Sequence, residues 1–171
     1  MSAARHFVAV AVAVAVVLTG CGEERPSGPV PALPERVLPP EIAGLTATRE
    51  ASADKAFASA GDGSLTARGA VWTLRADGAV RGALQVGVLK PEYDAEEIEV
   101  RRGVRSNIET GQYRWFKVDD QWVGVQDLPE LKLYLWFPPG GDLYEVLQLQ
   151  PDVPDQKTLL RAIIDFQEDT A

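Results

Sequence analysis

Cys21 is the residue of this chain with the clearest chemistry, because it is the only cysteine among 171 residues. A cysteine thiolate is a nucleophile, so a lone cysteine in a defined context is a candidate for covalent modification. Arg5 precedes an apolar run from Phe7 to Leu18, and small residues stand directly before Cys21. A charged start, a short apolar core and small residues before a cut site are typical of a secretion signal. We therefore predict export, with cleavage beside Cys21.

The quartet Leu18-Thr19-Gly20-Cys21 closely resembles the lipobox of bacterial lipoproteins. The resemblance implies that residues 1–20 are removed and that Cys21, as the new N-terminus, carries a diacylglyceryl thioether, often with a third acyl chain on its amine. Two or more acyl chains give stable anchoring. We therefore expect the protein to be attached to the cell membrane through the lipid on Cys21 and to lie outside the cytoplasm.

Two alternatives to a lipid anchor follow from the same residues. The apolar run is shorter than the roughly 20 residues that span a bilayer, so a transmembrane anchor is the weaker interpretation. A free thiol at Cys21 is the other, although an exposed lone thiol is a liability in an oxidising compartment.

The residues that the mature chain lacks restrict its chemistry. The single histidine, His6, lies in the signal, which excludes histidine-based triads and His/Cys zinc sites from the mature chain. Removal of residues 1–20 takes one of 17 basic residues and none of the 25 acidic ones, leaving a formal net charge of −9. Such a protein as a whole attracts neither nucleic acid nor an anionic bilayer surface. We expect no cofactor and no metal, and we predict that the protein is not an enzyme.

The segment after Cys21 is rich in proline, since six of the twelve prolines fall within residues 22–40. Proline neither continues a helix nor pairs within a sheet. We predict a lipidated N-terminus and disordered, semi-rigid linker over residues 21–41, which at about 3.1 Å per residue reaches roughly 60 Å. A single domain is expected over residues 42–171.

Patterns along residues 42–171 predict both helices and strands. An alanine-rich stretch predicts a short helix at 51–60, Asp94 is a candidate helix cap before a helix that ends at Gly111, and Asp155 caps a final amphipathic helix. An Asp77-Gly78 turn predicts a hairpin. Further strands are expected at four places: 113–118, 122–126, 131–137 and 144–150.

These elements predict an α+β fold. We expect an antiparallel sheet of about six strands, a hairpin plus a four-strand meander, covered on one face by two or three helices. The helix after Asp94 carries a basic cluster of Arg101, Arg102 and Arg105, which we interpret as a solvated helix face rather than an anion site.

Alternation along the four late strands separates two sets of side chains, because neighbours on a strand point to opposite faces. The first set is apolar and predicts a core face: Phe116, Val118, Val123, Val125, Leu131, Leu133, Leu135, Phe137, Leu147 and Leu149. The second set mixes aromatic and polar residues: Tyr113, Trp115, Lys117, Trp122, Gln126, Lys132, Tyr134, Trp136, Tyr144 and Gln148.

The mixed set allows two interpretations. Neighbouring elements can bury its rings in part, since cross-strand aromatic pairs stabilise sheets. Alternatively that side of the sheet is open, and Trp115, Trp122, Tyr134 and Trp136 form a platform that binds an envelope glycan, lipid or protein, because large exposed apolar patches mark binding surfaces.

The element order is similar to that of LpqN-type actinobacterial lipoproteins and of the wider PsbP-like fold. The strand pair Tyr134-Leu135-Trp136-Phe137 and Tyr144 to Leu149, ahead of a terminal helix, carries the resemblance. It implies a helix-covered antiparallel sheet and a binding or scaffold role, and it supplies no catalytic residue.

Three functions therefore remain as hypotheses. The first is a lipid-anchored, non-catalytic binding or accessory domain. The second is a carrier of an apolar small molecule or lipid, because a curved sheet closed by helices can enclose an apolar pocket. The third is a carboxylate-based hydrolase of envelope glycans, for which a pair of acidic side chains suffices.

Overall fold

A computed structural model describes residues 28–34, 37–52, 65–108 and 113–169. Cys21, the signal and most of the helix predicted at 51–60 lie outside these residues. The described strands and helices are, in chain order, β1 Glu41–Ile42, β2 Leu45–Arg49, β3 Thr66–Ala76, β4 Ala79–Leu89, α2 Ile98–Ile108, β5 Arg114–Val118, β6 Gln121–Asp127, β7 Lys132–Trp136, β8 Leu143–Leu149 and α3 Gln156–Glu168.

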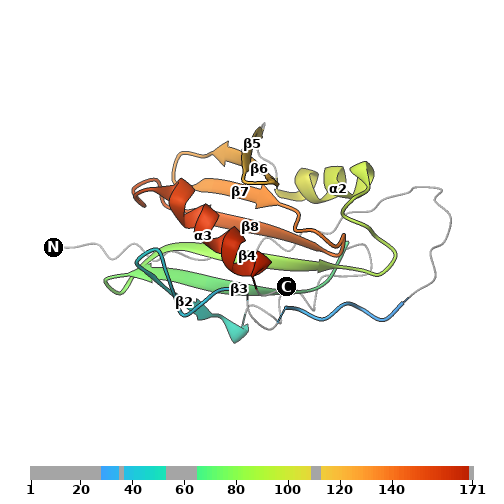
Figure 1. The fold of residues 1–171 in the computed structure, drawn as a ribbon, viewed down its shortest axis with the longest axis horizontal. Helices are drawn as coiled ribbons and strands as arrows, with labels where there is room; N and C mark the ends of the chain where they lie inside the picture. The colour runs from blue at the N-terminus through green and yellow to red at the C-terminus, as the bar shows by residue number, and fades with distance from the viewer. Residues whose placement is uncertain (1–27, 35–36, 53–64, 109–112, 170–171) are drawn as a thin grey trace.

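The eight described strands form one antiparallel sheet in the order β1-β2-β3-β4-β8-β7-β6-β5 (Figure 1). The predicted hairpin is β3–β4, and the predicted meander is β5 to β8, which returns to pair β8 with β4. The α+β class, the hairpin and the meander are confirmed. The strand number differs from the predicted six because β1 and β2 extend the sheet beyond β3.

The β1–β2 hairpin was not anticipated because its signals are weak. Its turn consists of Ala43 and Gly44, which both have positive φ angles of 47° and 78°. Alanine is an unusual residue for that conformation, whereas Asp77 and Gly78 in the β3–β4 turn are the residues that two-residue hairpins favour. The sequence patterns therefore predict no strand between the linker, which ends at residue 41, and the helix expected at 51–60.

The two described helices cover opposite faces of the sheet, which corrects the expectation of helices on one face. Buried α3 residues share a cluster with Val123, Tyr134 and Leu147, whereas Val100 and Val104 of α2 share a second cluster whose sheet residues include Leu133, Leu135 and Val146. Side chains on one strand alternate between faces, so the clusters lie on either side of the sheet. We call these sides the α3 face and the α2 face.

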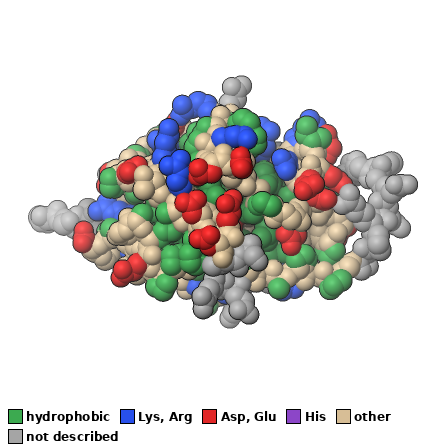
Figure 2. Space-filling model, viewed as in Figure 1, with side chains coloured by type: hydrophobic (Ala, Val, Ile, Leu, Met, Phe, Trp, Pro, Cys, Tyr) green, Lys and Arg blue, Asp and Glu red, His purple; other side chains and the backbone are tan. Residues whose placement is uncertain are grey.

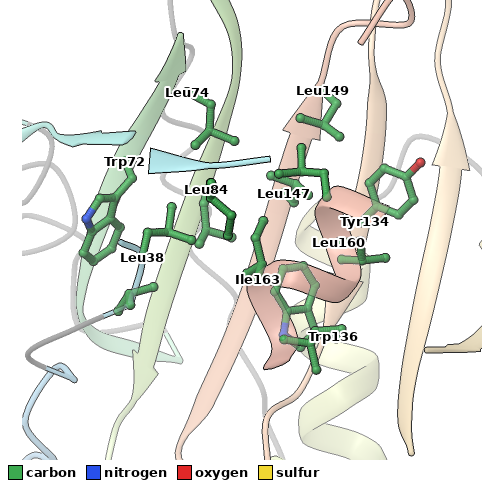
Figure 3. Close-up of a cluster of buried hydrophobic side chains, with 14 of the residues drawn as sticks. Leu38, Trp72, Leu74, Leu84, Tyr134, Trp136, Leu147, Leu149, Leu160 and Ile163 are labelled. Carbon is green, nitrogen blue, oxygen red and sulfur yellow. The ribbon is translucent and has the colours of Figure 1, made fainter. Parts of the chain in front are cut away.

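The core on the α3 face includes residues from the predicted linker. Val37 and Leu38 are buried there, and Leu33 packs against the same cluster. Figure 3 shows Leu38 near Trp72 and Leu84, with Ile163 of α3 close by. Packing of the domain thus begins before Ile42, because apolar residues between the prolines find a buried site beside the sheet.

Both helix starts are governed by aspartates. Asp155 is the N-cap of α3, as predicted, and its carboxylate accepts a hydrogen bond from the Thr158 backbone N–H. Asp94 instead accepts from the Glu96 N–H within a turn that precedes α2, which begins at Ile98. The cap predicted at Asp94 therefore organises the approach to the helix rather than its first turn.

Candidate functional site

The four aromatic residues predicted to share one platform lie on opposite faces of the sheet. Trp115 and Trp122 are on the α2 face and are 39% and 54% exposed. Tyr134 and Trp136 are on the α3 face and are only 4% and 1% exposed. The predicted four-ring surface therefore does not exist.

The register across β6 and β7 explains the difference. Val123 pairs with Trp136 and Val125 with Tyr134, and residues paired across strands point to the same face. The face assignment from alternation holds for the other three late strands and is inverted for 131–137 alone. The turn between β6 and β7 sets this register, and alternation within a strand does not reveal it.

The two buried rings are part of the core under α3. Trp136 is paired across strands with Val123 and Glu145. The Tyr134 hydroxyl donates to Gln156 Oε1 of α3 over 2.7 Å, and burial raises the pKa of Tyr134 to about 12. Figure 3 shows Trp136 and Tyr134 beside Leu160 of α3. These rings stabilise the domain and are not available to a partner.

Glu145 is a buried acid in the same core. Its Oε2 accepts a hydrogen bond of 2.9 Å from Gln167 Nε2, and Gln167 also donates to the Val37 carbonyl. Burial raises the pKa of Glu145 from its ordinary value of 4.5 to about 8, and the hydrogen bond from Gln167 offsets only part of this shift. Glu145 is therefore mostly protonated at neutral pH and links the sheet to the end of α3.

On the α2 face, contacts with neighbouring residues fix the position of the Trp115 side chain. A Cβ placed on Gly124, its cross-strand partner, would lie only 3.0 Å from the Trp115 ring and equally close to the Tyr113 ring. The Tyr113 and Trp115 ring centroids are 6.1 Å apart. The guanidinium of Arg105, from α2, lies 5.4 Å from the Trp115 ring centroid. A glycine, a tyrosine and an arginine thus hold this indole in place.

Two further cations lie over rings beside Trp115. Lys117 Nζ is 5.6 Å from the ring centroid of Trp122, its cross-strand partner, and the Arg101 guanidinium is 5.4 Å from the centroid of Phe137. Cations at such distances are attracted to the ring face. We call the set of Arg101, Arg105, Trp115, Lys117 and Trp122 the Trp–Arg patch.

Two cations of the Trp–Arg patch, Arg101 and Lys117, are only partly compensated among the described residues. Arg101 donates to the Ala95 backbone carbonyl, and within the described ranges it has no ion pair. Lys117 Nζ lies 4.0 Å from an Asp120 carboxylate oxygen, at the limit of an ion pair. Arg102, next to the patch, is paired with Glu99 at 2.8 Å. The patch therefore presents positive charge beside half-exposed indole rings in a protein that is acidic as a whole.

A second candidate site is a hollow of about 190 Å³ at the other end of the sheet. Polar groups of Glu50, Thr73, Arg75 and Gln148 contribute to its lining. Glu50, the one carboxylate in the lining, already accepts a hydrogen bond of 2.8 Å from the Thr73 hydroxyl. The hollow lacks the pair of carboxyl groups on which glycoside hydrolysis depends.

Two aspartates in turns, Asp119 and Asp152, have local roles. Asp119 has a positive φ of 50° in the β5–β6 turn and pairs with Arg161 of α3, and Asp152 pairs with Arg81. In the described part of the chain, no three His, Cys, Asp or Glu side chains gather as metal ligands, and no helix is long and apolar enough to cross a membrane.

No family model matches this chain, and no curated protein or solved structure matches it. The site is therefore argued from its own geometry.

The sequence patterns indicate Trp115, Trp122 and the arginine cluster separately and do not predict that they lie side by side. Arg101 and Arg105 are four positions apart on one helix face, and Lys117 shares its strand face with Trp115. These spacings indicate a basic stripe and a basic–aromatic strand. Their juxtaposition depends on how α2 packs on the sheet, which neither spacing reveals.

Proposed function

We propose that this protein is a lipid-anchored, extracytoplasmic binding or accessory domain that acts without catalysis and whose contact surface is the Trp–Arg patch. The observation that carries the contact surface is the pair of exposed indoles, Trp115 and Trp122, flanked by cations on one face of the sheet. Tryptophan and arginine are the residues most enriched where binding energy concentrates in interfaces. The lipobox-like quartet ending in Cys21 supports the anchor.

The other hypotheses have less support. The space between the sheet and α3 is filled by buried side chains, and the described hollow is only about 190 Å³, with Glu50, Arg75 and Gln148 among its lining residues. Neither favours a carrier of an apolar molecule. The hollow also supplies a single carboxylate, so a glycan hydrolase is not favoured.

The contact surface is tested by binding of the full chain to sedimented envelope fragments. Trp122→Ala should reduce binding, because its ring is the most exposed aromatic group of the patch. Val30→Ala is the matched control, since Val30 is another exposed apolar residue, 37% exposed, outside the patch. Equal binding by wild type and Trp122→Ala would show that the patch is not the contact surface.

The anchor is tested separately by intact-mass analysis of the membrane form. The expected mature chain begins at Cys21 and carries an acyl increment. Cys21→Ser removes the nucleophile and should leave an unlipidated chain that is retained as precursor or shed. A wild-type mass without acyl chains would overturn the anchor and leave the Trp–Arg patch untouched.

A further inference from the structure

The composition of the Trp–Arg patch matches that of surfaces which lie in a membrane interface. Indole rings concentrate at the level of lipid headgroups, where one end is apolar and the other is wet. Trp122 is half exposed, Arg101 and Lys117 are exposed beside the rings, and Ile98 of α2 is 70% exposed nearby in the chain. Cations near an anionic bilayer are attracted to it, each by about 1 kcal/mol or roughly fivefold in affinity.

Exposed acidic residues gather at the end of the helix on the α3 face. On the α3 face, the last turns of α3 expose Asp165, Glu168 and Asp169, and Figure 2 shows acidic side chains gathered over this helix. The patch lies on the opposite face. An acidic protein is repelled by an anionic surface as a whole, so docking depends on the exposed cations and rings of the patch, and the exposed Glu97 near the start of α2 opposes it.

The N-terminal segment lies beside the connection between β4 and the helix that carries the patch arginines. A Cβ built on Gly28 would lie 3.8 Å from Pro91 Cβ, and Pro91 belongs to the connection between β4 and α2. Cys21 precedes Gly28 by seven positions, which span at most about 25 Å when fully extended. This reach is less than half of the roughly 60 Å expected for a linker of residues 21–41. A lipid on Cys21 therefore keeps the connection between β4 and α2 near the bilayer.

From these observations we infer that the Trp–Arg patch docks onto anionic phospholipid headgroups of the membrane in which Cys21 is anchored. The inference rests on the proposed lipid-anchored function and names the partner of its contact surface. Tethering makes docking intramolecular, so a high effective concentration allows a small patch to suffice. The domain then lies with its α2 face on the bilayer and its acidic α3 face toward the cell exterior.

The test uses the full, lipidated chain reconstituted into vesicles that contain brominated lipid, which quenches nearby indoles. One set of vesicles is phosphatidylcholine with roughly one-third phosphatidylglycerol, and the other is phosphatidylcholine alone. Trp122 fluorescence should be quenched in the anionic vesicles and not in the neutral ones. Trp72 and Trp136 are buried, so the accessible indoles are Trp115 and Trp122, and the part of the quenching that Trp122→Phe removes belongs to Trp122.

A pair of charge-matched variants tests the patch itself. Arg101→Gln with Lys117→Gln removes two patch cations and should weaken docking about 30-fold, since each contributes about fivefold. Lys157→Gln with Arg161→Gln removes two cations from α3, on the other face, and should leave docking unchanged. Urea unfolding of both double variants confirms that each is folded.

The outcomes separate this inference from the proposed function. Equal quenching in both vesicle types, or equal loss in both double variants, would overturn the inference. A Trp122 response to a soluble sulfated polysaccharide without quenching in anionic vesicles would also overturn it, because the patch would then recognise an anionic glycan. In that case the proposed binding function would stand. If Trp122 shows no response to either probe and Trp122→Ala binds envelope fragments as well as wild type does, both this inference and the proposed contact surface would be overturned.

Discussion

The four tryptophans of this protein divide equally between two environments. Trp72 and Trp136 are buried on the α3 face, where the segment around Val37 and helix α3 cover the sheet. Trp115 and Trp122 lie on the α2 face, on β5 and β6 at one end of the strand order, and have cations over their rings. The same residue type therefore serves the core on one face and a charged surface on the other.

This difference shows that aromatic residues do not identify a binding surface unless it is known which other elements of the fold cover their rings. An indole contributes a large apolar area whether it faces a helix or water. What distinguishes the two pairs is the neighbouring element. A complete amphipathic helix lies over Trp136, whereas Trp115 is flanked by single cationic side chains that leave part of its ring accessible.

The comparison is tested most strongly by truncating one ring from each face. Trp136→Ala should destabilise the domain by about 3–5 kcal/mol, because it leaves a cavity beneath α3. Trp122→Ala should cost about 0.5–1 kcal/mol, the range of an exposed cation–π contact. Urea unfolding of the full chain measures both. Equal losses of stability would mean that the two faces do not differ as described.

Glu145 gives the α3 face a dependence of stability on pH in the neutral range. Its pKa is raised by burial to about 8, while the unfolded chain has the ordinary value of 4.5. As pH rises between these values the unfolded state releases a proton that the folded state retains. Stability should therefore fall by roughly 1.4 kcal/mol per pH unit in this window, and the contribution is complete below it.

Glu145→Gln is the matched variant, because it keeps the shape and hydrogen-bonding capacity but cannot ionise. The stability difference between this variant and wild type should change steadily from pH 5 to about 8 in favour of the variant. Urea unfolding at several pH values gives this difference directly. A difference that stays constant with pH would show that Glu145 has the same proton affinity in both states.

Much of the fold could be predicted because its signals are local. The Asp77-Gly78 turn, the Asp155 cap and the four-strand meander each depend on residues close in sequence. The β1–β2 hairpin was missed because Ala43-Gly44 is a poor turn signal beside prolines.

The candidate site was predicted only in part because it depends on relations between elements. Alternation placed Tyr134 and Trp136 with Trp115, since it gives two faces per strand but not the register that joins one strand to the next. Arg105 reaches Trp115 only through the packing of α2. Burial of Glu145 likewise follows from coverage by α3, which its sequence context does not indicate.

A substitution at Gly124 should have a smaller effect on stability and tests the packing of Trp115 against this glycine. Gly124→Ala should cost about 1–3 kcal/mol, because the new methyl group would press against the rings of Trp115 and Tyr113. Repeating the substitution in a Trp115→Ala background removes one of the two rings, so part of this cost should disappear. The coupling is obtained from the four urea unfolding free energies. An identical cost in both backgrounds would show that Trp115 does not rest on Gly124.

The smallest expected effect concerns the ion pair that joins α3 to the β5–β6 turn. Arg161 Nε lies 3.1 Å from Asp119 Oδ2, and both side chains are more than half exposed. Exposed pairs of this kind contribute about 0.2–1 kcal/mol, which a double-mutant cycle with Asp119→Asn and Arg161→Gln measures. The coupling should vanish near about 1 M salt, where the Debye length is about 3 Å. By contrast, Leu160 and Ile163 are fully buried, and their contribution should not respond to screening in this way. A salt-sensitive coupling well above 1 kcal/mol would mean that charge rather than burial holds α3 on its face, and the contrast between the two pairs of tryptophans would then need another cause.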